Sequence, residues 1–123
     1  MNLNLDHTKK YLLGCSFGPD SMALLHMLKN EGYNFSVAHV NYGLRKEADD
    51  ETQALINYCR ENNISLFTIK IDSIPQTNIE AKCREIRYKY FASLCQQNHF
   101  DYVVVGHHED DLLETYLLQK RRK

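Results

Sequence analysis

A rhythm that occurs four times along the chain constrains the fold more than any other feature: a short, β-rich apolar run precedes a helical pattern. The apolar runs are bounded by turn or polar residues and predict strands over residues 11–15, 35–40, 66–71 and 102–106. The intervening patterns predict helices over residues 20–30, 49–62, 79–97 and 110–120. Strands that alternate with helices of this length imply right-handed crossovers. We therefore expect an α/β fold, a doubly wound parallel sheet with helices on both faces.

The ends of two predicted helices carry residues that favour helix termination or capping. Asn78 stands directly before the third helix, where its side chain can cap the first turn. The first helix ends before Gly32, and glycine adopts a left-handed C-cap most easily. In a doubly wound sheet, ligands bind beyond the carboxyl ends of the strands, so the segments that follow each strand are the candidate functional segments.

Composition narrows the classes of protein and partner. The 123 residues predict a single domain, 1–123, which we expect to be part of a longer domain or protein and to stop after the fourth strand–helix unit. Fifteen basic and sixteen acidic side chains give a net charge of -1, so any nucleic-acid contact must be local. The sequence shows no apolar run of membrane-spanning length and no signal peptide, which predicts a cytoplasmic protein without a membrane partner. The four cysteines form no C-x-x-C pair, which indicates reduced, buried thiols.

The turn after the first predicted strand leads directly into a helix and is typical of an anion site. Its six residues are Ser16, Phe17, Gly18, Pro19, Asp20 and Ser21. Backbone N–H groups and the helix dipole would face a phosphate there, and the two serine hydroxyls add donors. The aspartate would repel a bare phosphate and suits a metal ion or a cap. An ordinary capped turn remains the alternative, because the pattern matches neither of the common glycine-rich phosphate motifs.

The segment after the fourth predicted strand gathers histidines and carboxylates. His107 and His108 precede a predicted helix on which Asp110, Asp111 and Glu114 share one side, at spacings of three and four residues. Such oxygen ligands suit magnesium, whereas histidine with carboxylate suits zinc or manganese. The alternative is that these acidic residues merely complement the helix dipole.

Two further segments carry polar residues at informative spacings. His39, Asn41 and Arg45 follow the second strand, where a polar loop could lie along an adenine and the arginine could reach a phosphate; a surface loop is the alternative. On the third helix, Glu80, Arg84 and Arg87 are spaced by four and three residues, opposite the apolar stripe. A surface ion pair is the simpler reading of that spacing.

Together these segments resemble the PP-loop (N-type) ATP pyrophosphatase superfamily and, within it, the tRNA(Ile)-lysidine synthetase family. Residues 16–21 match the S-G-G-x-D-S loop of the superfamily. Three other segments match patterns of the narrower family in order: 39–45 (H-V-N-[HY]-G-L-R), 80–88 (E-A-x-x-R-x-x-R-Y) and 107–115 (H-H-x-D-D-x-x-E-T). The resemblance spans residues 10–118.

The resemblance implies an adenine nucleotide alpha hydrolase-like fold and an ATP-dependent ligase. ATP would adenylate the wobble cytidine of an isoleucine tRNA, and the amine of L-lysine would then displace AMP to give lysidine. It implies ATP binding by residues 16–21 with His39, Asn41, Arg45 and His107, and magnesium ligation by Asp20 and Asp110. It also implies catalytic roles for Asp20, Arg84, Arg87, Asp110 and Asp111, and substrate binding by Glu80, His108 and Glu114. A homo-oligomer is compatible with this pattern.

One departure from the superfamily pattern concerns ATP binding. Phe17 stands where the first loop glycine is expected, and a positive φ at phenylalanine costs roughly 1 kcal/mol or more. Phe17 would then either point outward or weaken ATP binding. Three alternatives stay open: a tRNA thiolation enzyme, a metal-dependent hydrolase that uses the histidines and aspartates of residues 107–111, and a nucleotide-binding module without activity.

Overall fold

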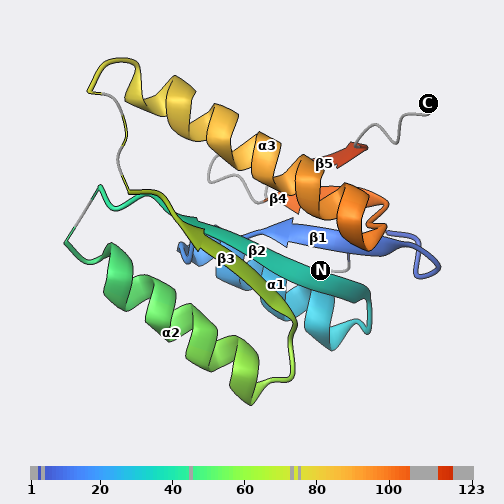
Figure 1. Cartoon of the computed structure of the whole chain (residues 1–123). Coiled ribbons are helices and arrows are strands. Elements are labelled where there is room, and N and C mark those ends of the chain that lie inside the picture. The colour runs from blue at the N-terminus through green and yellow to red at the C-terminus, as the bar shows by residue number, and fades with distance from the viewer. Residues whose placement is uncertain are drawn as a thin grey trace.

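The computed structural model describes residues 3, 5–44, 46–72, 74, 76–105 and 114–117. Its elements are β1 (Lys10–Gly14), α1 (Pro19–Asn30), β2 (Asn34–Asn41), α2 (Ala48–Glu61), β3 (Leu66–Lys70), α3 (Ile79–Asn98), β4 (Tyr102–Val105) and β5 (Glu114–Leu117). They form a five-stranded sheet in the order β3, β2, β1, β4, β5. The first four strands pair in parallel. Figure 1 shows α3 on one face of this sheet and α1 and α2 on the other, which confirms the α/β prediction.

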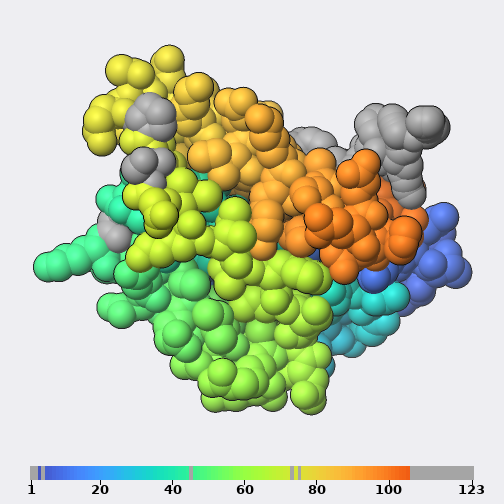
Figure 2. All heavy atoms as spheres, viewed as in Figure 1, coloured from blue at the N-terminus to red at the C-terminus, as the bar shows by residue number. Residues whose placement is uncertain are grey.

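The core consists of two apolar layers, one on each face of the sheet. Because strand side chains alternate between faces, Leu13 packs with Leu25 and Leu55 beneath α1 and α2, whereas Leu12 packs with Phe91 beneath α3. Figure 2 shows β3, in yellow-green, between α2 and α3 at the front of the molecule. Each layer thus fixes its helices against the sheet.

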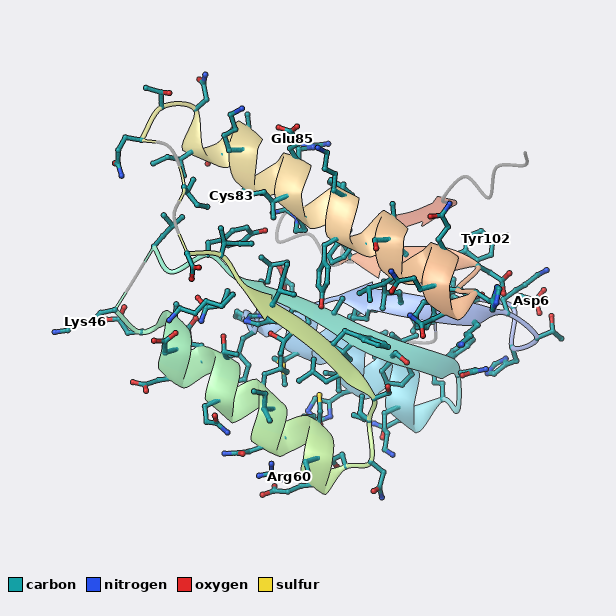
Figure 3. All side chains as sticks on the ribbon, in the orientation of Figure 1. Asp6, Lys46, Arg60, Cys83, Glu85 and Tyr102 are labelled. Atoms are coloured by element: carbon teal, nitrogen blue, oxygen red, sulfur yellow. The ribbon has the colours of Figure 1, made fainter. Side chains whose placement is uncertain are left out.

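The face that α3 turns to the sheet is apolar, and one close approach sets its position. Cys83 points toward the sheet whereas Glu85 points away from it (Figure 3). A Cβ on Gly14, at the end of β1, would lie 2.7 Å from the Phe91 ring. Glycine therefore lets α3 lie directly over the carboxyl end of β1. Arg87, one helical turn before Phe91, is thereby brought above that edge of the sheet.

Of the two predicted helix caps, the one at Gly32 is confirmed and the one at Asn78 is wrong. Gly32 has a φ of 75°, and its N–H donates to Lys29 O at 3.2 Å while the Tyr33 N–H donates to Leu28 O at 3.1 Å, so the predicted left-handed C-cap is confirmed. Asn78 occupies the N-cap of α3 but makes no side-chain cap hydrogen bond. Its φ of 52° is left-handed, whereas a capping side chain needs an extended backbone.

The predicted fourth helix is wrong over residues 114–117, which form β5. β5 pairs antiparallel with β4, Tyr102 opposite Leu117 and Val105 opposite Glu114. Without that pairing, one edge of β4 would leave its backbone N–H and C=O groups without strand partners. Thr115 and Tyr116 are also residue types that favour strands. The helix was predicted from the spacing of the carboxylates, and that spacing does not reveal that the edge of β4 is available for pairing. The sheet is therefore mixed at this edge.

No helix within the described residues has the length and hydropathy that a membrane span requires.

Candidate functional site

The loop between β1 and α1 folds back on itself around two serines. The Ser16 N–H donates to Ser21 Oγ at 3.3 Å, and the two hydroxyl oxygens lie 3.1 Å apart. Ser21 is only 5% exposed. Gly18 is the N-cap of α1 and provides no side-chain cap, and Pro19 begins the helix. The first-turn N–H groups and two hydroxyl donors thus gather at one helix terminus, an arrangement that suits a phosphate.

Phe17 adopts the left-handed backbone that its place in the loop demands, with a φ of 67°. This conformation costs an L-residue about 1 kcal/mol or more. The ring is half-buried and packs against the cluster under α1, which includes Cys15 and Leu24, so the burial of its apolar surface offsets part of the cost. The loop therefore keeps a glycine-like path while its side chain is anchored in the core.

His39, at the end of β2, links three elements. Its Nδ1 lies 2.8 Å from the Cys15 carbonyl oxygen and its Nε2 lies 2.9 Å from Thr52 Oγ1 on α2. Because a carbonyl oxygen only accepts, Nδ1 carries a proton and donates it to Cys15, while Nε2 forms a second hydrogen bond with the threonine hydroxyl. The histidine is 6% exposed. Its polar atoms hold the start of the serine loop against β2 and α2.

Asn41 fixes the loop after β2 in a similar way. Its Oδ1 accepts from the Gly43 N–H at 2.9 Å, and its Nδ2 donates to Asp49 Oδ1 at 2.8 Å. Gly43 has a φ of 67°, which glycine adopts without strain. Asp49 also forms an ion pair with Lys70 at 3.1 Å. Hydrogen bonds from Lys70 and then from Asn41 hold the pKa of the Asp49 carboxyl below its usual value.

The arginines on α3 gather around one aromatic ring. Arg84 and Arg87 lie over the Tyr88 ring, at 5.6 and 5.5 Å from its centroid. Arg87 is half-buried, whereas Arg84 and Glu80 are exposed. Cation–π contacts of this kind restrain the guanidinium groups without neutralising them. The structure therefore presents two positive charges beside the carboxyl edge of the sheet.

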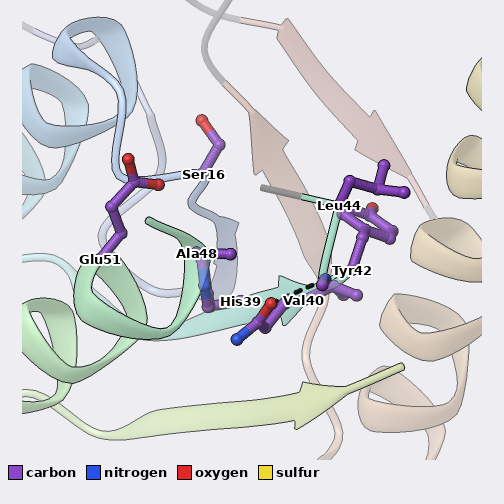
Figure 4. Close-up of a pocket in the computed structure, with 9 residues that line it drawn as sticks. Ser16, His39, Val40, Tyr42, Leu44, Ala48 and Glu51 are labelled. Carbon is purple, nitrogen blue, oxygen red and sulfur yellow. Dashed lines mark hydrogen bonds between the residues drawn. The ribbon is translucent and has the colours of Figure 1, made fainter. Parts of the chain in front are cut away.

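Two cavities adjoin at this edge. The first, of about 150 Å³, lies between the loop after β2 and the first turn of α2, and is lined by residues 39–44 with Ser16, Ala48 and Glu51 (Figure 4). The second, of about 310 Å³, lies under α3 and is lined by Ser16, Ser21, Arg87, Tyr88 and Phe91, among others. Ser16, Val40 and Tyr42 line both. A ligand in one cavity would thus meet a ligand in the other at the serine loop.

The remaining predicted site residues lie outside the part of the chain that the structure describes. They are Arg45, His107, His108, Asp110 and Asp111; Glu114 falls in β5. Among the described residues, no group of three or more His, Cys, Asp or Glu side chains could hold a metal ion. β4 pairs with β1 so that Val105 lies opposite Gly14, and Val105 lines the second cavity. β4 therefore ends at the edge that carries the serine loop.

Sequence analysis did not single out Tyr42, Thr52 or Glu51, although the structure brings all three to this edge. Tyr42 lies inside the segment 39–45, between Asn41 and Gly43, and its place in that motif was the available signal. Thr52 and Glu51 lie in the first turns of α2, where side chains are usually solvated, so nothing in the sequence marks them.

A comparison with protein families decides the family. Residues 2–123 match the PP-loop domain. This chain belongs to the PP-loop family. The match covers both cavities and the serine loop, so these features belong to the domain that defines the family.

Several curated relatives of this PP-loop chain are named tRNA(Ile)-lysidine synthase. The tRNA(Ile)-lysidine synthase of Mesomycoplasma hyopneumoniae (strain 232) is 39% identical over 124 residues, which cover 100% of this chain and 41% of the relative. The tRNA(Ile)-lysidine synthase of Lactobacillus gasseri is 42% identical over 117 residues, covering 90% of this chain and 27% of that relative. The chain thus spans about two fifths or less of the length of these relatives.

A solved structure confirms the fold. The U34-tRNA thiolase NcsA from Methanococcus maripaludis, solved with its 4Fe-4S cluster, has a TM-score of 0.71 and 23% identity. The match covers 84% of this chain and 39% of the thiolase. At that identity the likeness concerns the fold alone.

Proposed function

We propose that this PP-loop chain binds ATP at the serine loop and catalyses the formation of lysidine on an isoleucine tRNA. The observation that carries the proposal is the meeting of the two cavities at Ser16, because one ligand can transfer a group to another only where the two touch. The names of the curated relatives supply the reaction to be tested.

The first cavity suits the base of ATP. Its walls are mainly backbone and apolar groups at the end of β2. The polar atoms of His39 and Asn41 form hydrogen bonds within the protein and so hold these walls in place. A base in that cavity would direct its phosphates past Ser16 toward the first turn of α1. There the N–H groups and the serine hydroxyls would stabilise negative charge on the departing pyrophosphate.

The donor chemistry of the loop also fits magnesium. Asp20 stands in the first turn of α1, and Asp110 is the second predicted ligand. Carboxylate oxygens are preferred magnesium ligands, and a bound ion would neutralise charge on the phosphates. Asp111 is predicted to assist at the same place.

The second cavity suits the acceptor. In the first step, the cytidine 2-oxygen attacks the α-phosphorus of ATP, a new O–P bond forms and pyrophosphate leaves. In the second step, the lysine amine forms a C–N bond at C2 of the base, the C2–O bond breaks so that AMP leaves with that oxygen, and the amine gives up a proton. Arg87 in this cavity, with Arg84 nearby, would stabilise the negative centre or the RNA backbone. Glu80, His108 and Glu114 are the residues that we propose for lysine.

The cysteines favour the ligase over thiolation chemistry. All four are buried, and none forms a disulfide. Burial raises the pKa of Cys15 and Cys59 to about 11, and it also raises the pKa of Cys83. Sulfur transfer and cluster ligation need accessible thiolates, which such thiols rarely provide at neutral pH.

Measuring product release from ATP tests this proposal. We expect pyrophosphate release to require the cytidine-bearing isoleucine tRNA, and AMP release to require L-lysine in addition. Product release that depends on a sulfur donor would instead identify a thiolation enzyme. Stoichiometric zinc or manganese in the purified protein, without nucleotide affinity, would identify a hydrolase. ATP binding without product release would identify a silent module.

A further inference from the structure

Tyr42 lies where the two cavities meet, and its hydroxyl bonds to α3. It lines the first cavity and the second. Its hydroxyl lies 3.2 Å from Arg87 Nη1 and 3.3 Å from the Cys83 carbonyl oxygen, both on α3. A residue that follows β2 is thus bonded to the helix on the other side of the second cavity.

The direction of these hydrogen bonds is fixed by chemistry. A guanidinium has no acceptor, so Arg87 donates to the Tyr42 oxygen, and the hydroxyl proton is left to donate to the Cys83 carbonyl. Burial raises the pKa of Tyr42 although Arg87 opposes the shift, so the hydroxyl keeps its proton at neutral pH. Both bonds therefore form at once.

Arg87 is restrained on two sides by these neighbours. The Tyr42 oxygen accepts one N–H group, and the Tyr88 ring lies 5.5 Å from the guanidinium carbon. A free arginine side chain has many rotamers, and fixing it at the moment of reaction costs conformational entropy. Restraint beforehand keeps the charge beside Ser16 and Ser21, which line the same cavity.

We propose that Tyr42, which lines both cavities, is a positioning residue whose hydroxyl orients Arg87 in the acceptor cavity. This inference rests on the proposed function. The hydrogen bond then holds the positive charge of Arg87 in a fixed position relative to the loop after β2, which forms part of the nucleotide cavity. Tyr42 touches neither reacting atom and acts through Arg87.

The test compares Tyr42→Phe with wild type in the full chain. The variant keeps the ring and loses the hydroxyl. We expect the affinity for ATP, measured by calorimetry, to stay within about twofold, while the rate of pyrophosphate release at saturating ATP and tRNA falls about tenfold. In an Arg87→Ala background, the same change should alter that rate by no more than about twofold, because the partner through which it acts is gone.

A matched control is Tyr58→Phe. The Tyr58 hydroxyl bonds to His26 between α2 and α1, on the face of the sheet opposite to α3. Its loss should therefore leave the ATP affinity and the rate of pyrophosphate release unchanged. The inference is overturned if Tyr42→Phe retains the wild-type rate, if rate and ATP affinity fall together, or if the losses from the Tyr42 and Arg87 changes add. If the wild-type chain releases no pyrophosphate with tRNA, the proposed function is wrong. The inference about Tyr42 then fails with it.

Discussion

The loops after β1 and β2 lie side by side at the carboxyl edge of the sheet, yet among the described residues the polar side chains of the first bond only within their own loop, whereas those of the second also bond to other elements. At the end of β2, the side chains of Asn41 and His39 form hydrogen bonds to other groups of the protein. After β1, the hydroxyls of Ser16 and Ser21 bond to each other, and the N-cap of α1 provides no side-chain cap. Parallel pairing of β1 with β2 keeps the two loops adjacent.

The difference separates a supporting role from a binding role. Internally satisfied groups, as at Asn41, hold a loop in shape because breaking them would leave buried polar atoms unpaired. Donors at a helix terminus, as at Ser21, gain most from an incoming anion. Substitutions in the loop after β2 should therefore reduce stability first, whereas substitutions in the loop after β1 should reduce ATP affinity first.

The largest effect is expected from Asn41→Ala. The change removes two hydrogen bonds made by a buried side chain, one to the Gly43 N–H and one to an Asp49 oxygen, and should lower the free energy of unfolding by about 2 kcal/mol, about 1 kcal/mol for each bond. Urea denaturation measures it. Asn57→Ala on α2 also removes two side-chain partners, but at an exposed site, and should cost less than about 0.5 kcal/mol. Equal losses in the two variants would contradict the supporting role.

Ser21→Ala should reduce the ATP affinity more than the stability of the fold. Loss of its hydroxyl should weaken ATP binding about tenfold, roughly 1.4 kcal/mol, because a hydrogen bond to a charged phosphate is lost. Calorimetric titration with ATP measures the change. Ser93→Ala on α3, where the hydroxyl bonds only to an exposed Gln97 among the described contacts, is the control. An unchanged ATP affinity in Ser21→Ala would remove the loop from the nucleotide site.

The left-handed backbone of Phe17, in the loop after β1, allows the strain in that loop to be measured. Phe17→Gly and Phe17→Ala both lose the ring and its packing, so the difference between them isolates the backbone at a φ of 67°. We expect the glycine variant to be the more stable by about 1 kcal/mol in thermal or chemical denaturation, because glycine adopts this conformation without a Cβ penalty. A more stable alanine variant would show that the loop does not impose the left-handed conformation.

The smallest effect is expected from Lys70→Met. Lys70 holds the pKa of Asp49 below its usual value of 3.8, so this pairing stabilises the fold above that pH and is lost as the pH falls through the lowered value. The melting temperature of the variant should lie slightly below that of wild type at pH 7, and the two should converge in acid and in high salt. A difference that persists once Asp49 is protonated in strong acid would point to another cause.

The fold was largely predictable because local patterns and tertiary structure agree over most of the chain. Gly32 illustrates this agreement, since the residue that ends the apolar period is also the left-handed C-cap. Residues 114–117 illustrate the opposite, because their strand depends on a free edge of β4 that no local pattern reveals.

The candidate site was predictable in place but only partly in role. The positions of strand ends brought Ser21 and His39 to one edge, as expected for a doubly wound sheet. That both ring nitrogens of His39 bond within the protein depends on the placement of Cys15 and Thr52, which are far away in sequence. The bridge from Tyr42 to Arg87 spans 45 positions and required the folded helix.

The most direct test of the central claim is a crystal structure of the chain with a non-hydrolysable ATP analogue and magnesium. The account predicts the base between Tyr42 and α2, and the β- and γ-phosphates at the N–H groups and hydroxyls of residues 16–21. A nucleotide bound elsewhere, or phosphates that do not contact this loop, would contradict it.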